Sequence, residues 1–497
     1  MDNEKPRRKL ILHFDARNTL FLSDKSYRFT VEEALNSYIT GIVWGKLNDE
    51  PQRNGDNTVQ NHSSNCNSPT FTPMGSTSDH LINTNDVNND NQSMKVVKSQ
   101  VTYEMNQDHS SELNSHKNIN PVNSNINIKN CCRQPYAGEV FENLTSTELD
   151  HFKSTLACWN CLPESPCIRQ PRPDSISIYK LLERQIVKTP SDRGRLRKYL
   201  GNFTQTPEGI PFRNLFIEHL EMLKLTPTES STSPYCLYVN SRETNNCNGS
   251  NSSNLDNSDC YHYLMPAFFR LLTWLIETNR QFAIFIRTYG KDGEHILSAI
   301  EAYMNGEHPQ EKAPINAKQL IPIDHTKWYL KRSTTKPMFQ LYKETEHQDQ
   351  GEFQQLVNVS NNPKEIQKIW SNQTGSVSVI DDFPYWQAHN YHYQSSKPVW
   401  FNPRDQNVQH ILFDDNIRFE EDGSNVIDLQ YLDENDDSIT SVENNGSYSL
   451  DINDVMKWEN IYFVQADLLE IIRNRRYFIE KVTECETNLD RIQKDLV

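Results

Sequence analysis

The stretch KLILHFDARNTLFL, residues 9–22, decides how the chain is expected to fold. Its apolar run begins at Leu10, includes Ile11, Leu12 and Phe14, and ends on Asp15. A short run of this kind favours a strand that is buried in a parallel sheet. Open α/β sheets bind their ligands at the carboxyl ends of their strands, so this aspartate is a candidate site residue. Aspartate and asparagine are also ordinary turn residues, so a simple turn after the strand is the alternative interpretation.

The formal net charge of the chain is −16. This charge argues against a protein that binds nucleic acid or an anionic membrane, because both partners require a basic face. No apolar run approaches the roughly 18 residues that a membrane-spanning helix needs. The apolar run near the basic start is also shorter than the about 7–15 residues of a signal peptide. We therefore expect a cytoplasmic protein with no nucleic-acid or membrane partner.

Ten cysteines fit that expectation if most of them are free thiols, which a reducing compartment favours. Cys158 and Cys161 form one CxxC pair, and Cys167 follows six residues later. A zinc site usually needs a fourth ligand at a recognisable spacing, for which His151 is the candidate. We favour free thiols over a zinc site here.

Segments of biased composition divide the chain. Residues 51–130 contain 18 asparagines among 80 residues and have no sustained apolar period, so they bury too little surface to offset the entropy of ordering. The acidic stretch 433–449 is interpreted in the same way. We predict a discontinuous core of residues 1–45 and 261–497, a disordered Asn/Ser-rich insert at 51–133, a helical insertion at 134–225 and a second disordered insert at 226–260.

The remaining sequence combines helical and strand patterns, which indicates an α/β fold. Thr30 with Glu33 forms a capping box, and apolar residues at helical spacing continue from there toward residue 44. A second strand is expected at 282–286, followed closely by Thr288. Further helices are expected at 178–186, 211–225, 261–278, 292–303 and 467–496, and a last strand at 461–464.

Two pairs of carboxylates follow apolar strands in the last third of the chain. Asp381 and Asp382 stand in SVSVIDDFPYW, and Asp414 and Asp415 stand in HILFDDNI. Either pair has the oxygen ligands that a hard cation requires. From the residues alone, both pairs are candidates for a metal site.

A locally basic stretch lies within the predicted helical insertion and contains Lys188, Arg193, Arg195, Arg197 and Lys198. The interpretation that we favour is a solvated helix face. The alternative is a surface that faces an anionic substrate.

Three segments of the chain, in the order in which they occur, resemble the haloacid dehalogenase-like (HAD) superfamily, and in particular an uncharacterised eukaryotic branch of it: LHFDARNT, FIRTYG and ILFDDNI. The resemblance spans the chain outside the biased segments. It implies a Rossmann-like parallel sheet with a mainly helical cap inserted after the first strand unit. It also implies that Asp15 is a nucleophile that forms an aspartyl-phosphate, and that Thr288 and Lys397 contact the phosphoryl group. Mg²⁺ would be held by Asp15 with Asp414 and Asp415.

The choice between the two acidic pairs depends on a lysine that the superfamily places upstream of its last motif. Lys397, in SKPVWFNP, precedes Asp414 by 17 residues and favours the later pair. Lys364 or Lys368 would serve the earlier pair, which stays open as the rival metal site.

One position departs from the superfamily pattern. Its phosphatases carry a second aspartate two residues after the nucleophile, as general acid and base, and this chain has Arg17 there. A guanidinium group keeps its proton at neutral pH, and loss of a general acid typically costs about 10²–10⁴ in rate. Arg17 and Thr19 are interpreted as substrate-binding residues. We therefore expect a slow phosphohydrolase or phosphotransferase that acts on a phosphorylated substrate, or else an inactive binding or scaffold protein that captures a protein partner.

Overall fold

The computed structural model describes residues 7–22, 29–48, 143–225, 236–238, 260–333, 338–345, 355–418, 425–432 and 447–495. The insert predicted at 51–133 lies outside the described residues. Of the insert predicted at 226–260, the structure describes Cys236–Tyr238, which form strand β5, and Cys260, where β6 (Cys260–His262) begins. These two strands pair in antiparallel fashion.

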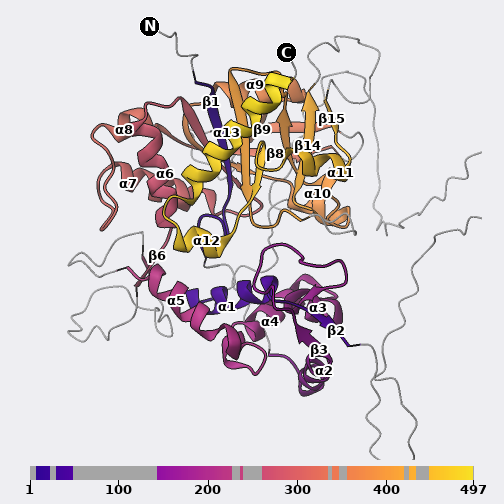
Figure 1. The fold of residues 1–497 in the computed structure, drawn as a ribbon. Coiled ribbons are helices and arrows are strands. Elements are labelled where there is room, and N and C mark those ends of the chain that lie inside the picture. Colours follow the sequence, from indigo (N-terminus) through magenta and orange to yellow (C-terminus); the bar gives the residue numbers. More distant parts are fainter. Residues whose placement is uncertain are drawn as a thin grey trace, which may run out of the picture. The chain divides into compact units, whose positions relative to one another are not determined.

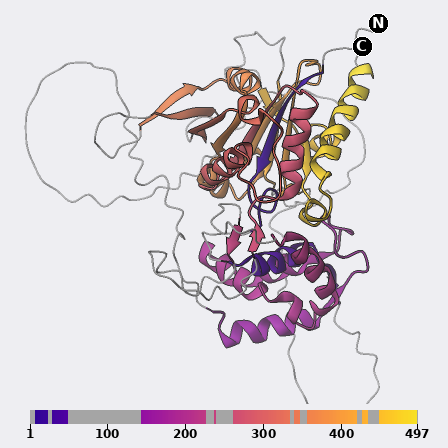
Figure 2. The ribbon, with the colours of Figure 1, turned by 90° about the vertical axis from the view of Figure 1, so that its left-hand side faces the viewer.

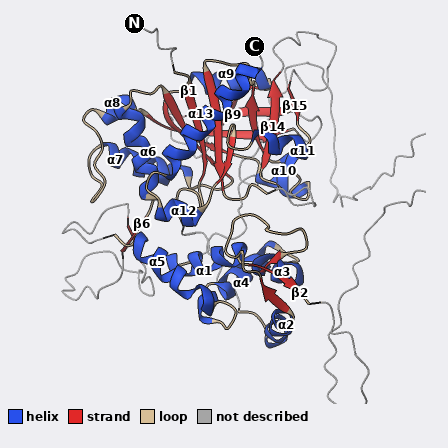
Figure 3. Cartoon of the chain, viewed as in Figure 1, coloured by secondary structure: helices blue, strands red, loops and turns tan. Residues whose placement is uncertain are grey.

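The fold is mixed α/β, with a large and mostly parallel sheet of eight strands (Figure 3). The strand order is β10-β9-β8-β11-β7-β1-β13-β16. The section from β8 to β16 is parallel, while β9 pairs with β8 and β10 in antiparallel fashion. The bounds are β1 Lys9–Asp15, β7 Phe282–Thr288, β8 Ile323–Arg332, β9 Phe339–Thr345, β10 Gln355–Ser360, β11 Gly375–Ile380, β13 Val408–Asp414 and β16 Phe463–Gln465.

Strand β1 lies between β7 and β13 and is covered on both faces, as its apolar run predicts. Leu12 and Phe14 pack in one core with helices α6 (Pro266–Glu277), α7 (Gly293–Met304) and α13 (Tyr477–Asp495). Ile11 points to the other face, toward Trp370 of α9 (Pro363–Asn372). In Figure 2, the rose α6 and the yellow α13 lie along the same side of the indigo strand β1.

The helices that were predicted individually are present with two exceptions, and α9 is a helix that was not predicted. Helix α1 (Val31–Ile42) begins at the predicted capping box of Thr30 and Glu33. The helix predicted at 261–278 begins only at Pro266, a residue suited to a first helical turn, because the residues before it form β6. The prediction of a single helix at 467–496 is wrong, because two helices lie there. The first, α12 (Leu468–Arg473), ends at Asn474, whose side chain accepts a hydrogen bond from the backbone N–H of Arg476 before α13 starts. In the described part of the chain, no helix has the length and apolar character to cross a membrane.

Smaller elements complete the fold. A second sheet, β12 (Lys397–Phe401), β14 (Ile427–Leu432) and β15 (Ser447–Ser449), packs on the same face of the large sheet as α9. The predicted insertion contains α2 (Ser146–Ala157), α3 (Ile178–Ile186), α4 (Pro190–Leu200) and α5 (Arg213–Leu223). Its strands β3 (Trp159–Cys161) and β4 (Ile176–Ser177) form a small sheet with β2 (Trp44–Leu47), which precedes the predicted insertion in the sequence. Helix α1 packs against α3, α4 and α5 (Figure 1). The division of the chain into core and insertion at residue 45 stays a prediction.

Candidate functional site

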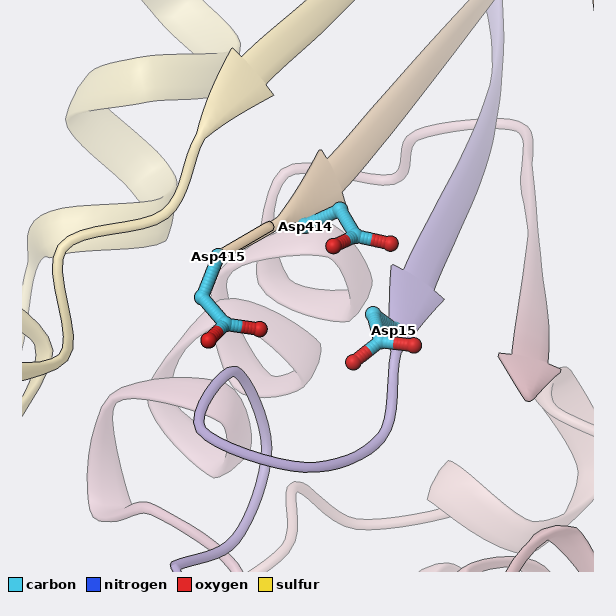
Figure 4. Close-up of side chains that lie close together, drawn as sticks. All are labelled: Asp15, Asp414 and Asp415. Atoms are coloured by element: carbon cyan, nitrogen blue, oxygen red, sulfur yellow. The ribbon is translucent and has the colours of Figure 1, made fainter. Parts of the chain in front are cut away.

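Three carboxylates meet at the carboxyl ends of β1 and β13. The two strands are parallel and in register up to the pair Phe14 and Phe413, so Asp15 and Asp414 are the next residues of each strand. Asp415 follows, and one oxygen from each of the three carboxylates lies within 4.8 Å of the others. Figure 4 shows the three side chains turned toward a common space. The resemblance implied that Asp15 lies beside Asp414 and Asp415, and the three side chains do lie together.

A buried lysine joins two of these carboxylates. The Lys397 Nζ donates to Asp15 Oδ1 at 2.5 Å and to Asp414 Oδ2 at 2.8 Å, and it lies 3.3 Å from the carbonyl oxygen of Arg287. Lys397 is the first residue of β12, in the second sheet, and is 1 % exposed. The three carboxylates and this one ammonium group together have two net negative charges when all four groups are ionised.

The electrostatics of the cluster reflect this excess of negative charge. Burial, and then the neighbouring Asp414, raise the pKa of Asp15 well above its ordinary value. The same two causes raise the pKa of Asp415 to about 7. Burial alone would lower the pKa of Lys397, but the charges of Asp15 and Asp414 raise it above its ordinary value. A bound cation would relieve the repulsion between the carboxylates.

The turn after β1 closes one side of the cluster. Asn18 adopts a left-handed conformation with φ of 56°, which asparagine tolerates better than most residues. Its side-chain amide donates to Asp415 Oδ2 at 3.0 Å. Arg17 is half-buried in this turn, and Thr19 is fully buried with no hydrogen-bond partner for its hydroxyl among the described residues. Asn18 was not among the residues predicted from the sequence, although an asparagine in a predicted turn was the available signal.

The rival acidic pair is engaged elsewhere. Asp381 accepts two hydrogen bonds from the guanidinium group of Arg287, at 2.9 Å and 2.6 Å, and both side chains are buried. Asp382 accepts a hydrogen bond from the backbone N–H of Arg332 at 3.0 Å and caps α10 (Phe383–Ala388). The structure brings Asp414 and Asp415, and not this pair, into the group that contains Asp15.

Thr288 lies at the same edge of the sheet. It follows Arg287, which is the residue of β7 paired with Asp15. Its buried hydroxyl accepts a hydrogen bond from the backbone N–H of Gly290 at 2.9 Å, which leaves the hydroxyl hydrogen available as a donor. Arg287 was not among the residues predicted from the sequence, although a charged residue that ends a buried apolar run is a signal of buried pairing.

The basic stretch and the cysteines form no part of this cluster. Arg193 pairs with Glu183 and donates to the hydroxyl of Tyr391 at 2.8 Å, while Arg195 pairs with Glu148 and Asp192. Cys161 and Cys167 are free thiols. Among the described residues, the group of three or more possible metal ligands is formed by the three aspartates and includes none of these cysteines.

The donor set of the cluster suits a hard divalent cation. Carboxylate oxygens are the preferred protein ligands of Mg²⁺, and the two excess negative charges match its charge. The nearby ammonium group and the threonine hydroxyl are suited to an anion such as a phosphoryl group. Comparison of the chain with family models, with curated proteins and with solved structures found no match. The function is therefore argued from the site itself.

Proposed function

We propose that this chain is a HAD-like, Mg²⁺-dependent phosphohydrolase or phosphotransferase that acts through an aspartyl-phosphate on Asp15, with the helical insertion as its cap. The observation that carries the proposal is the convergence of Asp15, Asp414 and Asp415, with Lys397 joining the first two. In this proposal the large parallel sheet is a Rossmann-like core of HAD type.

The three aspartates would hold Mg²⁺, with the backbone carbonyl of Arg17 as a further ligand. When bound, the ion would offset the repulsion between the attacking carboxylate and the phosphate. The fit rests on the oxygen donors, on their mutual distances within 4.8 Å and on the excess negative charge of the cluster.

The protein side chains define the reaction that we propose. In the described part of the chain no hydrogen bond reaches Asp15 Oδ2, and the side chain keeps 12 % of its surface exposed. This oxygen would attack phosphorus, forming an O–P bond as the ester O–P bond breaks. Lys397 and Thr288 would bind the oxygens of the phosphoryl group as its charge develops. Attack of water on phosphorus would then release phosphate and restore the carboxylate of Asp15.

Proton transfer to the leaving oxygen is the slow step that we expect in this reaction. The leaving oxygen needs a proton, and Arg17 stands where a carboxylic acid would supply it. Water would have to supply the proton, so we expect turnover about 10²–10⁴ below that of an enzyme with the acid in place. The same residue supports the second candidate function, a HAD-like binding or scaffold protein without turnover.

The first experiment measures hydrolysis of an aryl phosphate with and without Mg²⁺. Slow, Mg²⁺-dependent turnover is expected for the wild-type protein, and Asp15→Asn should abolish it because the amide is neither a nucleophile nor an anionic ligand. Asp454→Asn is the control, because Asp454 pairs with Lys457 on the surface and should leave turnover unchanged. Absence of turnover together with absence of Mg²⁺ binding in calorimetry would contradict the enzyme and leave the scaffold.

A second experiment uses Arg17→Asp to separate two roles of the arginine. If Arg17 only replaces a lost acid, the new carboxyl group should raise the rate of hydrolysis by supplying the proton. If Arg17 binds phosphate, the same change should raise the KM and lower the rate, because a carboxylate then replaces a guanidinium group. The ratio of kcat to KM for the two proteins distinguishes these outcomes.

A further inference from the structure

Tyr289 directly follows Thr288, at the carboxyl end of β7. Its ring lies 4.9 Å from the Lys397 ammonium nitrogen, which is within the range of a cation–π contact. Trp386 stacks on the ring at a centroid distance of 5.0 Å and an angle of 12°, and Phe383 contacts it edge-on at 5.6 Å. The ring is therefore held between the lysine of the acidic cluster and aromatic residues of α10.

The hydroxyl of Tyr289 is inaccessible to solvent and has no hydrogen-bond partner among the described residues. A buried tyrosine hydroxyl normally finds a partner, because an unsatisfied one loses the hydrogen bonds that it makes with water. An orphaned group of this kind therefore needs a specific explanation, such as a ligand that completes it.

The surroundings of this hydroxyl are acidic. Burial raises the pKa of Tyr289 well above its ordinary value, and the charges of Asp381 and Asp414 raise it further. Arg287 acts in the opposite direction, and Asp15 in the same direction as the other two carboxylates. The protonated hydroxyl is a hydrogen-bond donor on a residue whose ring contacts Lys397, and Lys397 in turn binds Asp15.

We propose that the Tyr289 hydroxyl donates a hydrogen bond to the phosphoryl group bound at Asp15, while its ring positions the Lys397 ammonium group. This inference rests on the proposed function and adds a residue to it. Thr288 and Tyr289 would then offer two neighbouring hydroxyl donors from the end of one strand. The substrate supplies anionic acceptor oxygens, so it would be the hydrogen-bond partner that the orphaned hydroxyl lacks.

The test measures binding of inorganic phosphate by calorimetry in the presence of Mg²⁺, with Tyr289→Phe as the variant. The phenyl ring keeps the contacts with Lys397 and Trp386, so only the hydroxyl is removed. Phosphate affinity should fall by roughly 10- to 100-fold, the range of a hydrogen bond to a charged group. Affinity for Mg²⁺ alone should stay within about twofold, and the Tm of the ligand-free variant should be unchanged or higher, because an unsatisfied group has been removed.

Tyr303→Phe is the matched control. The Tyr303 side chain is buried, and its hydroxyl, unlike that of Tyr289, has a partner among the described residues: it lies 2.6 Å from the hydroxyl of Thr273. Its removal should lower the Tm and leave phosphate affinity unchanged. The two variants are thus expected to show opposite patterns, which a purely structural role of Tyr289 would not produce.

Three results would overturn the inference. Wild-type phosphate affinity in Tyr289→Phe would show that the hydroxyl does not contact the phosphoryl group, while the proposed function would stand. A fall of the Tm equal to that of the Tyr303 control would show a structural hydroxyl. Failure of the wild-type protein to bind phosphate with Mg²⁺ would contradict the proposed function itself, and the inference with it.

Discussion

Replacement of Lys397 by methionine tests the electrostatics of the site most severely. The ammonium group is 1 % exposed and joins Asp15 and Asp414 at 2.5 Å and 2.8 Å. Loss of one partner of a buried ion pair leaves an uncompensated charge and typically costs about 3–5 kcal/mol. We therefore expect Lys397→Met to lower the free energy of unfolding by about that amount at pH 8 in the absence of divalent cations.

The loss should depend on pH with a defined sign. Without the lysine, the native pKa of Asp15 rises further above its unfolded value, so the native state binds the proton more tightly than the unfolded state. Stability then falls as pH rises, and the variant should lose less at pH 5 than at pH 8. Addition of Mg²⁺ should recover part of the loss at pH 8, because the cation binds the native state only.

Urea unfolding at both pH values, with EDTA or with Mg²⁺, measures these effects. Lys457→Met is the control, because Lys457 lies 2.5 Å from Asp454 but the two side chains are 73 % and 52 % exposed. A surface pair contributes about 0–1 kcal/mol, so this variant should unfold nearly as the wild type does. Equal stability of Lys397→Met and the wild type, or equal losses at the two pH values, would refute the reasoning.

Three further predictions concern the surroundings of the cluster. Asp381→Asn should lower the free energy of unfolding by about 3–5 kcal/mol, because it leaves Arg287 buried and unpaired. The Mg²⁺ Kd of this variant should be unchanged in calorimetry, whereas loss of Mg²⁺ affinity at unchanged stability would support the rival metal site. Mg²⁺ affinity should fall as pH decreases below 7, since Asp415, with a pKa of about 7, must lose its proton to bind the ion. A Mg²⁺ Kd that does not change between pH 5 and 8 would contradict this prediction. Asn18→Gly keeps the left-handed backbone but removes the amide that orients Asp415, so the Mg²⁺ Kd should rise roughly tenfold, and an unchanged Kd would show that the amide is dispensable.

The sequence predicted the strands of the site because their signal is local. The apolar run that ends at Asp15 and the run that ends at Asp414 each identify a buried strand and its carboxyl end. Parallel strands bring such ends to one edge, so the two aspartates could be expected to meet. The capping box of α1 was predictable for the same reason, since it depends on residues three positions apart.

The choice between the two acidic pairs depends on strand order, which no local pattern contains. Asp381 and Asp414 both follow apolar strands, but the order β11-β7-β1-β13 places only Asp414 on a strand next to Asp15. Arg287, on the strand between β11 and β1, pairs with Asp381. The contact between Tyr289 and Lys397 could not be predicted from a local pattern either, because the two residues are more than a hundred positions apart.

The break between α12 and α13 shows a second limit. Helical spacing continues through residues 467–496, so a periodic pattern alone predicts one helix. The helix ends because Asn474 takes an extended conformation and its side chain bonds to the backbone of Arg476. Side-chain competition of this kind is a tendency of asparagine rather than a rule, so the sequence did not decide it.

The central claim is that Asp15 accepts a phosphoryl group in a Mg²⁺ site formed with Asp414 and Asp415. The most direct measurement incubates the protein with Mg²⁺ and an aryl phosphate, quenches it in acid and locates any phosphoryl group by peptide mass spectrometry. The proposed chemistry predicts one acid-stable, hydroxylamine-sensitive phosphoryl group on Asp15, which is lost with EDTA and in Asp414→Asn. An unmodified Asp15, or a phosphoryl group on another residue that persists in Asp15→Asn, would contradict it.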